Sequence, residues 1–276
     1  CPGETYHVAP TGSDLAAGTA WETAFQTLSK AVTAASADDL ILVTNATYLL
    51  DAQVLVNKAL TLRSWNNGAL DPEGTILRRS GLTDHRILEV TAPALIQGFT
   101  LENGKGSYGG GAYLNPNARL TDSIVRNNAG VSGGGLYVAA GQVERCTITN
   151  NQSTAFGAGV CFDADQTGGL LSDCTISGNI SANYGGGVYL DHATGVTCRI
   201  EGNQGERGGG VYMNAQGLLR NSLLAANTAT ARGGGIGMNG GRAENCTVVG
   251  NTSLGEATAE GGGGLYCDYR NAWITL

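Results

Sequence analysis

A glycine triplet that returns at intervals of 23 to 29 residues constrains the fold of this chain more than any other feature. The triplets stand at residues 109–111, 133–135, 185–187, 208–210, 233–235 and 262–264, and Gly157-Ala158-Gly159 fills the remaining place. Glycine makes up 44 of the 276 residues, more than twice the usual share of about 7 %. Because a fixed period marks stacked structural units, the sequence predicts a repeat protein.

A second phrase interleaves with the triplets and reads, in one copy, Cys146-Thr147-Ile148-Thr149-Asn150-Asn151. Its closing asparagine recurs at positions 128, 151, 179, 203, 227 and 251. Both phrases alternate apolar and variable residues over a few positions, which is typical of short, half-buried strands. The glycines are too frequent for helices. The repeat therefore predicts units of about 24 residues, each with two or three short strands joined by tight turns.

One such unit is predicted to form one coil of a parallel β-solenoid, with each strand about 4.8 Å from its counterpart in the next coil. Equivalent residues then stack into columns that run along the solenoid. One inward apolar column is predicted to contain Leu101, Val125, Ile148, Ile176, Ile200, Leu224 and Val248. Two further inward columns begin at Ala112 and Leu114. Together these columns predict a continuous core.

The N-terminal part departs from the repeat and is predicted to be a cap over residues 1–35, with a strand near 6–10 and an amphipathic helix within 21–35. The solenoid then covers residues 36–276, with regular coils from about residue 98. The helical spacing is that of Trp21, Phe25, Leu28 and Val32, with Thr19 or Thr23 available as the N-cap. Such a cap would cover the open end of the first coil.

These features together resemble the right-handed parallel β-helix proteins of the pectate-lyase-like superfamily. The Gly-Gly-Gly-apolar-Tyr and Cys-Thr-Ile-x-x-Asn phrases are similar to repeats of bacterial surface proteins of the polymorphic outer membrane type. The resemblance covers roughly residues 36–276 and implies an all-β, single-domain right-handed parallel β-helix. It implies an extracellular or bacterial cell-surface location. It does not choose an activity, since the superfamily contains lyases, hydrolases, epimerases and non-catalytic adhesins.

Charge and hydropathy exclude two classes of partner. The chain has 16 Lys and Arg against 23 Asp and Glu, with a net charge of −7. This acidic balance argues against a nucleic-acid partner. No apolar run approaches the roughly 20 residues that a transmembrane helix needs, so no membrane span is predicted.

Two columns are predicted to have structural roles. One holds Cys146, Cys174, Cys198 and Cys246, with Ser123 and Ser222 in two of its places. Because small thiols are often buried, we expect free and unreactive cysteines there. The closing asparagines are predicted to form a ladder, because asparagine tolerates left-handed backbone and its amide can bond to the amides above and below.

A tyrosine column is the first candidate for ligand contact. It contains Tyr113, Tyr137, Tyr189, Tyr212 and Tyr266, with Cys161 and Gly237 as interruptions. These residues alternate with inward ones, so their rings are expected to face solvent, where they could stack on sugar rings. The alternative, which we favour, is that the rings stack on one another across coils and protect the sheet face.

Acidic residues follow the tyrosine strands, and Asp163 and Asp191 are the candidates for a calcium site because they stand on adjacent coils. The alternative for each is an ordinary turn closed by its own side chain. Arg199, Arg207 and Arg232 match no lyase signature residue by residue, and His192, at the bend after Asp191, is expected to be an ordinary surface histidine. No cofactor is required by this pattern, and Ca²⁺ is the one ion it suggests.

The chain is therefore interpreted as a secreted or cell-surface module, without catalytic activity, for adhesion, display or contact with an extracellular polysaccharide or cell-surface glycan. One alternative is a polysaccharide lyase or glycoside hydrolase acting on an extracellular glycan, with uronate-containing chains among the candidates. Another is a filament subunit with end-to-end self-association, because residues 272–276 read as a strand that begins a further coil. Whether the protein is an enzyme is left open, with a lyase as the enzymatic candidate.

Overall fold

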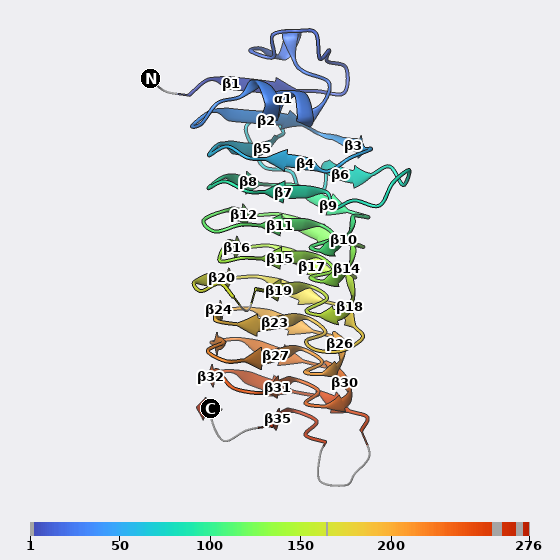
Figure 1. Cartoon of the computed structure of the whole chain (residues 1–276), viewed down its shortest axis with the longest axis vertical. Helices are drawn as coiled ribbons and strands as arrows, with labels where there is room; N and C mark the ends of the chain where they lie inside the picture. The colour runs from blue at the N-terminus through green and yellow to red at the C-terminus, as the bar shows by residue number, and fades with distance from the viewer. Residues whose placement is uncertain (1–2, 164, 256–260, 269–272, 276) are drawn as a thin grey trace.

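The computed structural model describes residues 3–163, 165–255, 261–268 and 273–275. The strands wind into stacked coils that form one elongated solenoid (Figure 1). Among the described residues they make four parallel sheets of 11, 9, 9 and 7 strands, here named A, B, C and D. Each regular coil passes through A, B, D and C in that order. The short strands of sheet D are additional to the two or three per coil that the repeat predicts.

Sheet A contains β1 (Thr5–Val8), β2 (Leu40–Thr44), β5 (Thr61–Trp65), β8 (Leu95–Gln97), β12 (Arg119–Thr121), β16 (Gln142–Glu144), β20 (Gly169–Ser172), β24 (Ala193–Val196), β28 (Leu218–Arg220), β32 (Arg242–Glu244) and β36 (Trp273–Thr275). Sheet B contains β3 (Ala46–Leu50), β6 (Thr75–Arg79), β9 (Thr100–Glu102), β13 (Ile124–Arg126), β17 (Thr147–Thr149), β21 (Thr175–Ser177), β25 (Arg199–Glu201), β29 (Leu223–Ala225) and β33 (Thr247–Val249).

Sheet C contains β4 (Val54–Val56), β7 (Leu88–Val90), β11 (Ala112–Leu114), β15 (Leu136–Val138), β19 (Val160–Phe162), β23 (Val188–Asp191), β27 (Val211–Asn214), β31 (Ile236–Met238) and β35 (Leu265–Cys267). Sheet D contains β10 (Lys105–Tyr108), β14 (Ala129–Ser132), β18 (Gln152–Phe156), β22 (Ile180–Ser181), β26 (Gln204–Arg207), β30 (Thr228–Arg232) and β34 (Thr252–Ser253). The chain thus folds as a parallel β-helix.

The predicted inward columns are confirmed by the strand register. Ile148 pairs with Ile176, and Ile176 with Ile200, through sheet B. On sheet C, Leu136 pairs with Val160. These side chains are fully buried, so each coil contributes the same positions to one continuous core. Among the described residues, no helix is long and apolar enough to span a membrane.

The N-terminal segment differs from the prediction in the extent of its helix. A short 3-10 turn, η1 (Trp21–Thr23), precedes α1 (Leu28–Ala34). The N-cap of α1 is Thr27, whose hydroxyl accepts the backbone N–H of Lys30 at 3.2 Å, so Thr19 and Thr23 are wrong as caps. The reason is tertiary: Phe25 donates its N–H to the carbonyl of His7 at 2.8 Å and forms a parallel bridge with Val8. That pairing keeps the chain extended until α1 begins.

Each glycine of a triplet meets a different steric demand, as the third of the perfect triplets shows. Gly185 has a φ of +66°, a left-handed conformation that L side chains rarely adopt. A Cβ on Gly186 would lie 2.3 Å from the carbonyl oxygens of Gln204 and Gly209. A Cβ on Gly187 would lie 2.7 Å from the carbonyl oxygen of Gly210. The triplet therefore lets one coil lie directly against the backbone of the next.

The asparagine column forms the predicted ladder in the buried interior. Asn179 shows the pattern: its Nδ2 donates to the carbonyl of Ile148 at 3.0 Å and to Oδ1 of Asn203 at 2.9 Å. Its Oδ1 accepts both the backbone N–H and Nδ2 of Asn151, at 2.9 and 3.0 Å. The expected left-handed backbone, however, falls on the residue before each ladder asparagine, for example Asn150 at φ +55°. The ladder side chains thus point inward after the turn is complete.

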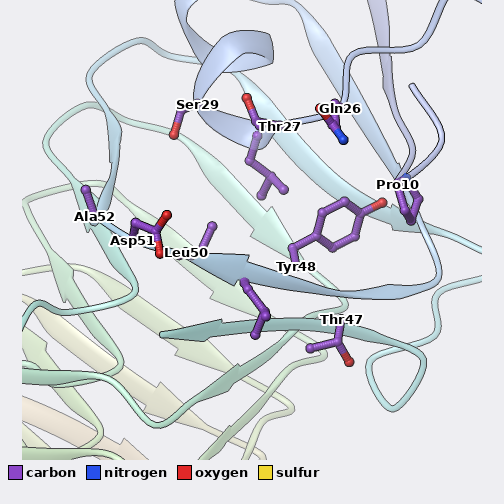
Figure 2. A pocket seen from close by; sticks show the side chains of 11 residues that line it. Pro10, Gln26, Thr27, Ser29, Thr47, Tyr48, Leu50, Asp51 and Ala52 are labelled. Carbon is purple, nitrogen blue, oxygen red and sulfur yellow. The ribbon is translucent and has the colours of Figure 1, made fainter. Parts of the chain in front are cut away.

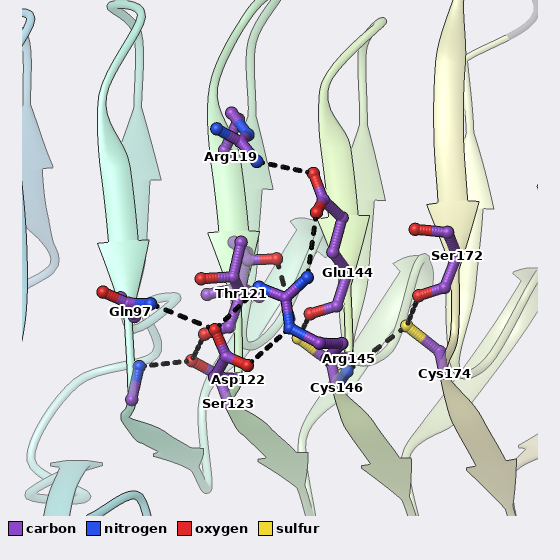
Figure 3. Close-up of polar contacts among 12 residues, drawn as sticks. Gln97, Arg119, Thr121, Asp122, Ser123, Glu144, Arg145, Cys146, Ser172 and Cys174 are labelled. Carbon is purple, nitrogen blue, oxygen red and sulfur yellow. Dashed lines mark hydrogen bonds and ion pairs between the residues drawn. The ribbon is translucent and has the colours of Figure 1, made fainter. Parts of the chain in front are cut away.

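The cysteine column forms a second ladder, at the corner between sheets A and B (Figure 3). Cys174 Sγ accepts the backbone N–H of Cys146 at 3.4 Å. In one of the serine positions, Ser222 Oγ accepts the N–H of Cys198 at 3.1 Å. A thiol or hydroxyl at this corner therefore satisfies a buried backbone donor. Burial raises the pKa of Cys198 to about 12, so this thiol stays protonated and unreactive.

The free state of these thiols leads to a titration experiment. The chain has seven cysteines and the six described ones are free, so at least six thiols are expected to react with a thiol reagent once the protein is unfolded. In the folded protein the exposed Cys267 is expected to react far faster than the buried Cys146, Cys174 and Cys198. The variant Cys267→Ser serves as the control and should lose that fast reaction. A deficit of one pair of thiols in the unfolded protein would reveal a disulfide and contradict the prediction.

On the solvent-facing side of the corner between sheets A and B, ion pairs link neighbouring coils (Figure 3). Arg145 lies 2.7 and 2.9 Å from the two carboxylate oxygens of Asp122, and Arg119 lies 2.8 Å from Glu144. The hydrogen bonds from Arg145 lower the pKa of Asp122 to about 2. These groups are partly exposed, so each pair stabilises the fold only modestly.

Candidate functional site

The tyrosine column lies on the outward face of sheet C and is stacked ring on ring. Tyr113 and Tyr137 have centroids 5.3 Å apart with an interplanar angle of 17°. Tyr189 and Tyr212 have centroids 5.9 Å apart with an angle of 9°. The strand register places Cys161 between these two stacks. Cross-coil stacking, the alternative favoured from the sequence, is therefore present in the structure.

A second aromatic row, which the sequence prediction missed, lies beside the first. Tyr108, Phe156 and Tyr184 lie at or just after the ends of sheet D strands. Their ring centroids lie 4.7 to 5.0 Å from those of Tyr137, Tyr189 and Tyr212, respectively. Their place in the sequence could have predicted this row, because each of the three immediately precedes a glycine triplet or its variant. We call the two rows together the aromatic face.

Packing between the rows limits how much of each ring meets solvent. Tyr212 is only 7 % exposed, so the expectation that its ring faces solvent is wrong, whereas Tyr108 is 49 % exposed. Tyr113, Tyr137, Tyr189 and Tyr266 are half-buried. Burial is the main cause that raises the pKa of Tyr137 and Tyr189, with the charges of Asp163 and Asp191 as further causes. These phenols therefore remain neutral hydrogen-bonding groups at physiological pH.

Arginines lie over the aromatic face. The guanidinium carbons of Arg86, Arg207 and Arg232 lie 5.2, 5.6 and 5.1 Å from the ring centroids of Tyr113, Tyr184 and Tyr266. Each is within the range of a cation–π contact. Asp268 lies 3.2 Å from Arg232 and 3.7 Å from Arg207, so the two cations share one carboxylate. The face thus combines flat apolar rings with charged and hydrogen-bonding groups.

The two aspartates predicted as calcium ligands lie in different environments. Oδ1 of Asp163 accepts the backbone N–H of Asp165 at 3.1 Å, as in a turn closed by its own side chain. Asp191 is 1 % exposed, and its Oδ2 accepts from Nδ2 of Asn214 at 2.9 Å. The described residues contain no group of three or more carboxylate, imidazole or thiol side chains placed to share a metal ion. Calcium binding at this pair stays a prediction.

Asp191 also belongs to a polar row that runs beside the tyrosines. Nδ2 of Asn239 donates to Oδ1 of Asn214 at 3.2 Å, and Asn214 in turn donates to Asp191. Nδ1 of His192 lies 2.7 Å from Oδ1 of Asp191, and the hydroxyl of Tyr189 lies 3.5 Å from Oδ2. An imidazole and a buried carboxylate therefore meet at the edge of the aromatic face.

A cleft of about 480 Å³ lies elsewhere, between the N-terminal segment and β3 (Figure 2). Pro10, Thr27 and Tyr48 line one part of it, with Leu50 and Asp51 nearby. The Tyr48 hydroxyl is already engaged, since it donates to the carbonyl of Val8 at 3.3 Å. We take the aromatic face, and not this cleft, as the candidate site.

Comparison with known proteins supports the fold. The family model described as the right handed beta helix region matches residues 87–267. The crystal structure of pectate lyase Pel9A is similar with a TM-score of 0.62 and 13 % identity, covering 99 % of this chain and 80 % of that one. A rhamnogalacturonan lyase structure gives 0.57 and 15 %, covering 88 % and 74 %. A search of curated proteins found no match. On the family match, the chain belongs to the right-handed β-helix family.

Proposed function

We propose that this protein is a secreted or cell-surface β-helix module that holds an extended polysaccharide along the aromatic face without cleaving it. The observation that carries the proposal is the pair of aromatic rows, which run along the solenoid and bear arginines and hydrogen-bonding groups. Sugar rings have apolar faces that pack on aromatic rings and hydroxyls that need polar partners. Coils about 4.8 Å apart repeat these contacts in steps comparable to the length of a sugar residue.

Binding without cleavage is favoured by how the acidic groups are held. Glycoside hydrolysis usually needs two carboxyl groups that face one another across the bond. On this face Asp163 closes its own turn, Asp191 is buried against Asn214, and Asp268 lies between two arginines. These engagements suit fixed hydrogen-bonding positions rather than an acid and a base aimed at a substrate.

A polysaccharide lyase is the second candidate. The two similar folds are named as lyases, which says what those proteins do. The contact between Asp191 and His192 is the observation on this chain that favours an enzyme, because a carboxylate-held imidazole can act as a base. Release of unsaturated products from a uronate-containing polysaccharide, followed by absorbance, would establish the lyase and contradict the non-catalytic proposal.

Tyrosine variants test the binding proposal against a panel of neutral and uronate-containing oligosaccharides. Tyr108→Ala and Tyr137→Ala are each expected to weaken binding by up to about tenfold, because each removes a ring from the face. The measurement is titration calorimetry on the tightest ligand of the panel. Leu49→Ala is the control, since Leu49 is 65 % exposed and lies on β3 of sheet B, outside the aromatic face. Equal affinity for all three variants and the unmodified protein would contradict the proposal.

A further inference from the structure

We propose that His192, held by Asp191, is a sugar-binding residue at the edge of the aromatic face. Its Nε2 accepts a hydrogen bond from a hydroxyl group of a neutral sugar residue that lies beside Tyr189. The inference rests on the proposed function and deepens it, because it names the residue that reads the saccharide. It assigns to Asp191 a positioning role in place of the predicted calcium ligation.

The surroundings of Asp191 fix its carboxylate. It is 1 % exposed although it is an acidic side chain. The amide groups of Asn239 and Asn214 donate one to the next, and the series ends on Oδ2 of Asp191. The hydroxyl of Tyr189 lies 3.5 Å from the same oxygen, so two side chains hold Oδ2 in place. Asp191 is therefore a carboxyl group in a fixed position at the edge of the face.

The other carboxylate oxygen defines the state of the histidine. Oδ1 of Asp191 is buried and makes no hydrogen bond of normal angle. Its neighbour Nδ1 of His192 is 2.7 Å away and equally lacks a well-aligned partner. A buried carboxylate oxygen left without a donor is costly, so a proton on Nδ1 is the state that relieves it. In a neutral imidazole this leaves the lone pair on Nε2.

The imidazole is partly exposed, with its buried Nδ1 beside Asp191. The side chain of His192 is 28 % exposed. Because Nδ1 is buried, the exposed part is the outer edge of the ring, where Nε2 lies. His192 directly follows β23, which carries Tyr189 of the aromatic face. A sugar packed beside Tyr189 thus has a hydrogen-bond acceptor at its edge.

The fold itself does not require a histidine at this turn. His192 has a φ of +49°, and Ala215, which follows the residue paired with Asp191, takes the equivalent place in the next coil with a φ of +38°. The backbone there accepts alanine, which has no polar side chain. The imidazole is therefore an addition to the turn, and its partner Asp191 is the group that holds it.

The test measures two quantities: which ring nitrogen of His192 carries the proton, and how tightly the protein binds an oligosaccharide. In the unmodified protein, nitrogen-15 shifts of the His192 ring are expected to show the proton on Nδ1. His192→Ala should weaken binding of the tightest oligosaccharide by about tenfold. His192→Gln should recover part of the lost affinity, because the amide oxygen of glutamine also accepts a hydrogen bond. Asp191→Asn should move the ring proton to Nε2, since the new amide donates to Nδ1, and should weaken binding by a similar factor.

Thr194→Ala is the matched control, because Thr194 lies two residues further on, in strand β24 of sheet A. Thermal unfolding of each variant shows whether it folds. If Asp191→Asn does not fold, the two His192 variants alone test the inference. A proton on Nε2 in the unmodified protein overturns the inference. Unchanged binding by His192→Ala, together with weak binding by the tyrosine variants, also overturns the inference. In that case the proposed function stands. If no oligosaccharide binds the unmodified protein, both proposals fail.

Discussion

Replacing Gly186 with alanine is expected to destabilise the protein by about 4 kcal/mol or more, which places it among the most damaging single substitutions. The added Cβ would lie 2.3 Å from the carbonyl oxygens of Gln204 and Gly209, and both are backbone atoms of the neighbouring coil. No side-chain rotation can relieve that overlap, so the coils must separate locally. Urea unfolding followed by circular dichroism measures the loss.

Gly202→Ala is the matched control for this substitution. Gly202 has a left-handed φ of +62°, but a Cβ there would meet no atom within 4 Å. Only the cost of the left-handed backbone remains, about 1 kcal/mol. Ala158 already takes the middle place of a triplet in another coil, which shows that the position is not closed to alanine everywhere. If the two variants lost equal stability, coil contact would not be the reason for the triplet.

Asn179→Ala is expected to cost about 4 kcal/mol, because several buried groups lose their partners at once. The carbonyl of Ile148 and the backbone N–H of Asn151 would each be left without the hydrogen bond that Asn179 provides. Asn179 is fully buried, so water cannot take its place without the coil opening. Urea unfolding measures the loss, and hydrogen exchange at the amide of Asn151 shows where it occurs.

Asn183→Ala is the control for the ladder, because its Nδ2 donates to the carbonyl of Thr154 at 3.1 Å on the surface. A cost below about 1 kcal/mol is expected there. Asn179→Asp keeps the shape and the acceptor but turns the donor toward Ile148 into an oxygen, so it too should be strongly destabilising. A mild effect of both Asn179 substitutions, with the Asn151 amide still protected from exchange, would show that the ladder does not hold the coils together.

The coils could be predicted from the sequence because like residues recur at the same step and pack on their own copies. The register of Ile148 on Ile176 needs no information beyond that period. The helix extent could not be predicted in the same way. Phe25 has the spacing of a helical residue, yet it is held extended by a hydrogen bond to His7, far from it in sequence.

The candidate site was only partly predictable, for a related reason. The tyrosines of sheet C repeat, so their column could be predicted. The row of Tyr108, Phe156 and Tyr184 also contains Ser132 and Arg207, so it could not be recognised from a repeated residue type. The burial of Tyr212 follows from that second row. The direction of the Asp191 carboxylate depends on Asn214, one coil away, which no local pattern in the sequence specifies.

The ladder of buried asparagines has a consequence for the length of the molecule. Each Nδ2 donates to the Oδ1 of the following coil, from Asn128 through to Asn251, so all the amides point the same way. Every coil therefore presents one neighbour with the same donor and the other with the same acceptor. A gene duplication of one complete unit would therefore continue the ladder unbroken, and it would lengthen the aromatic face wherever the duplicated coil carries a tyrosine.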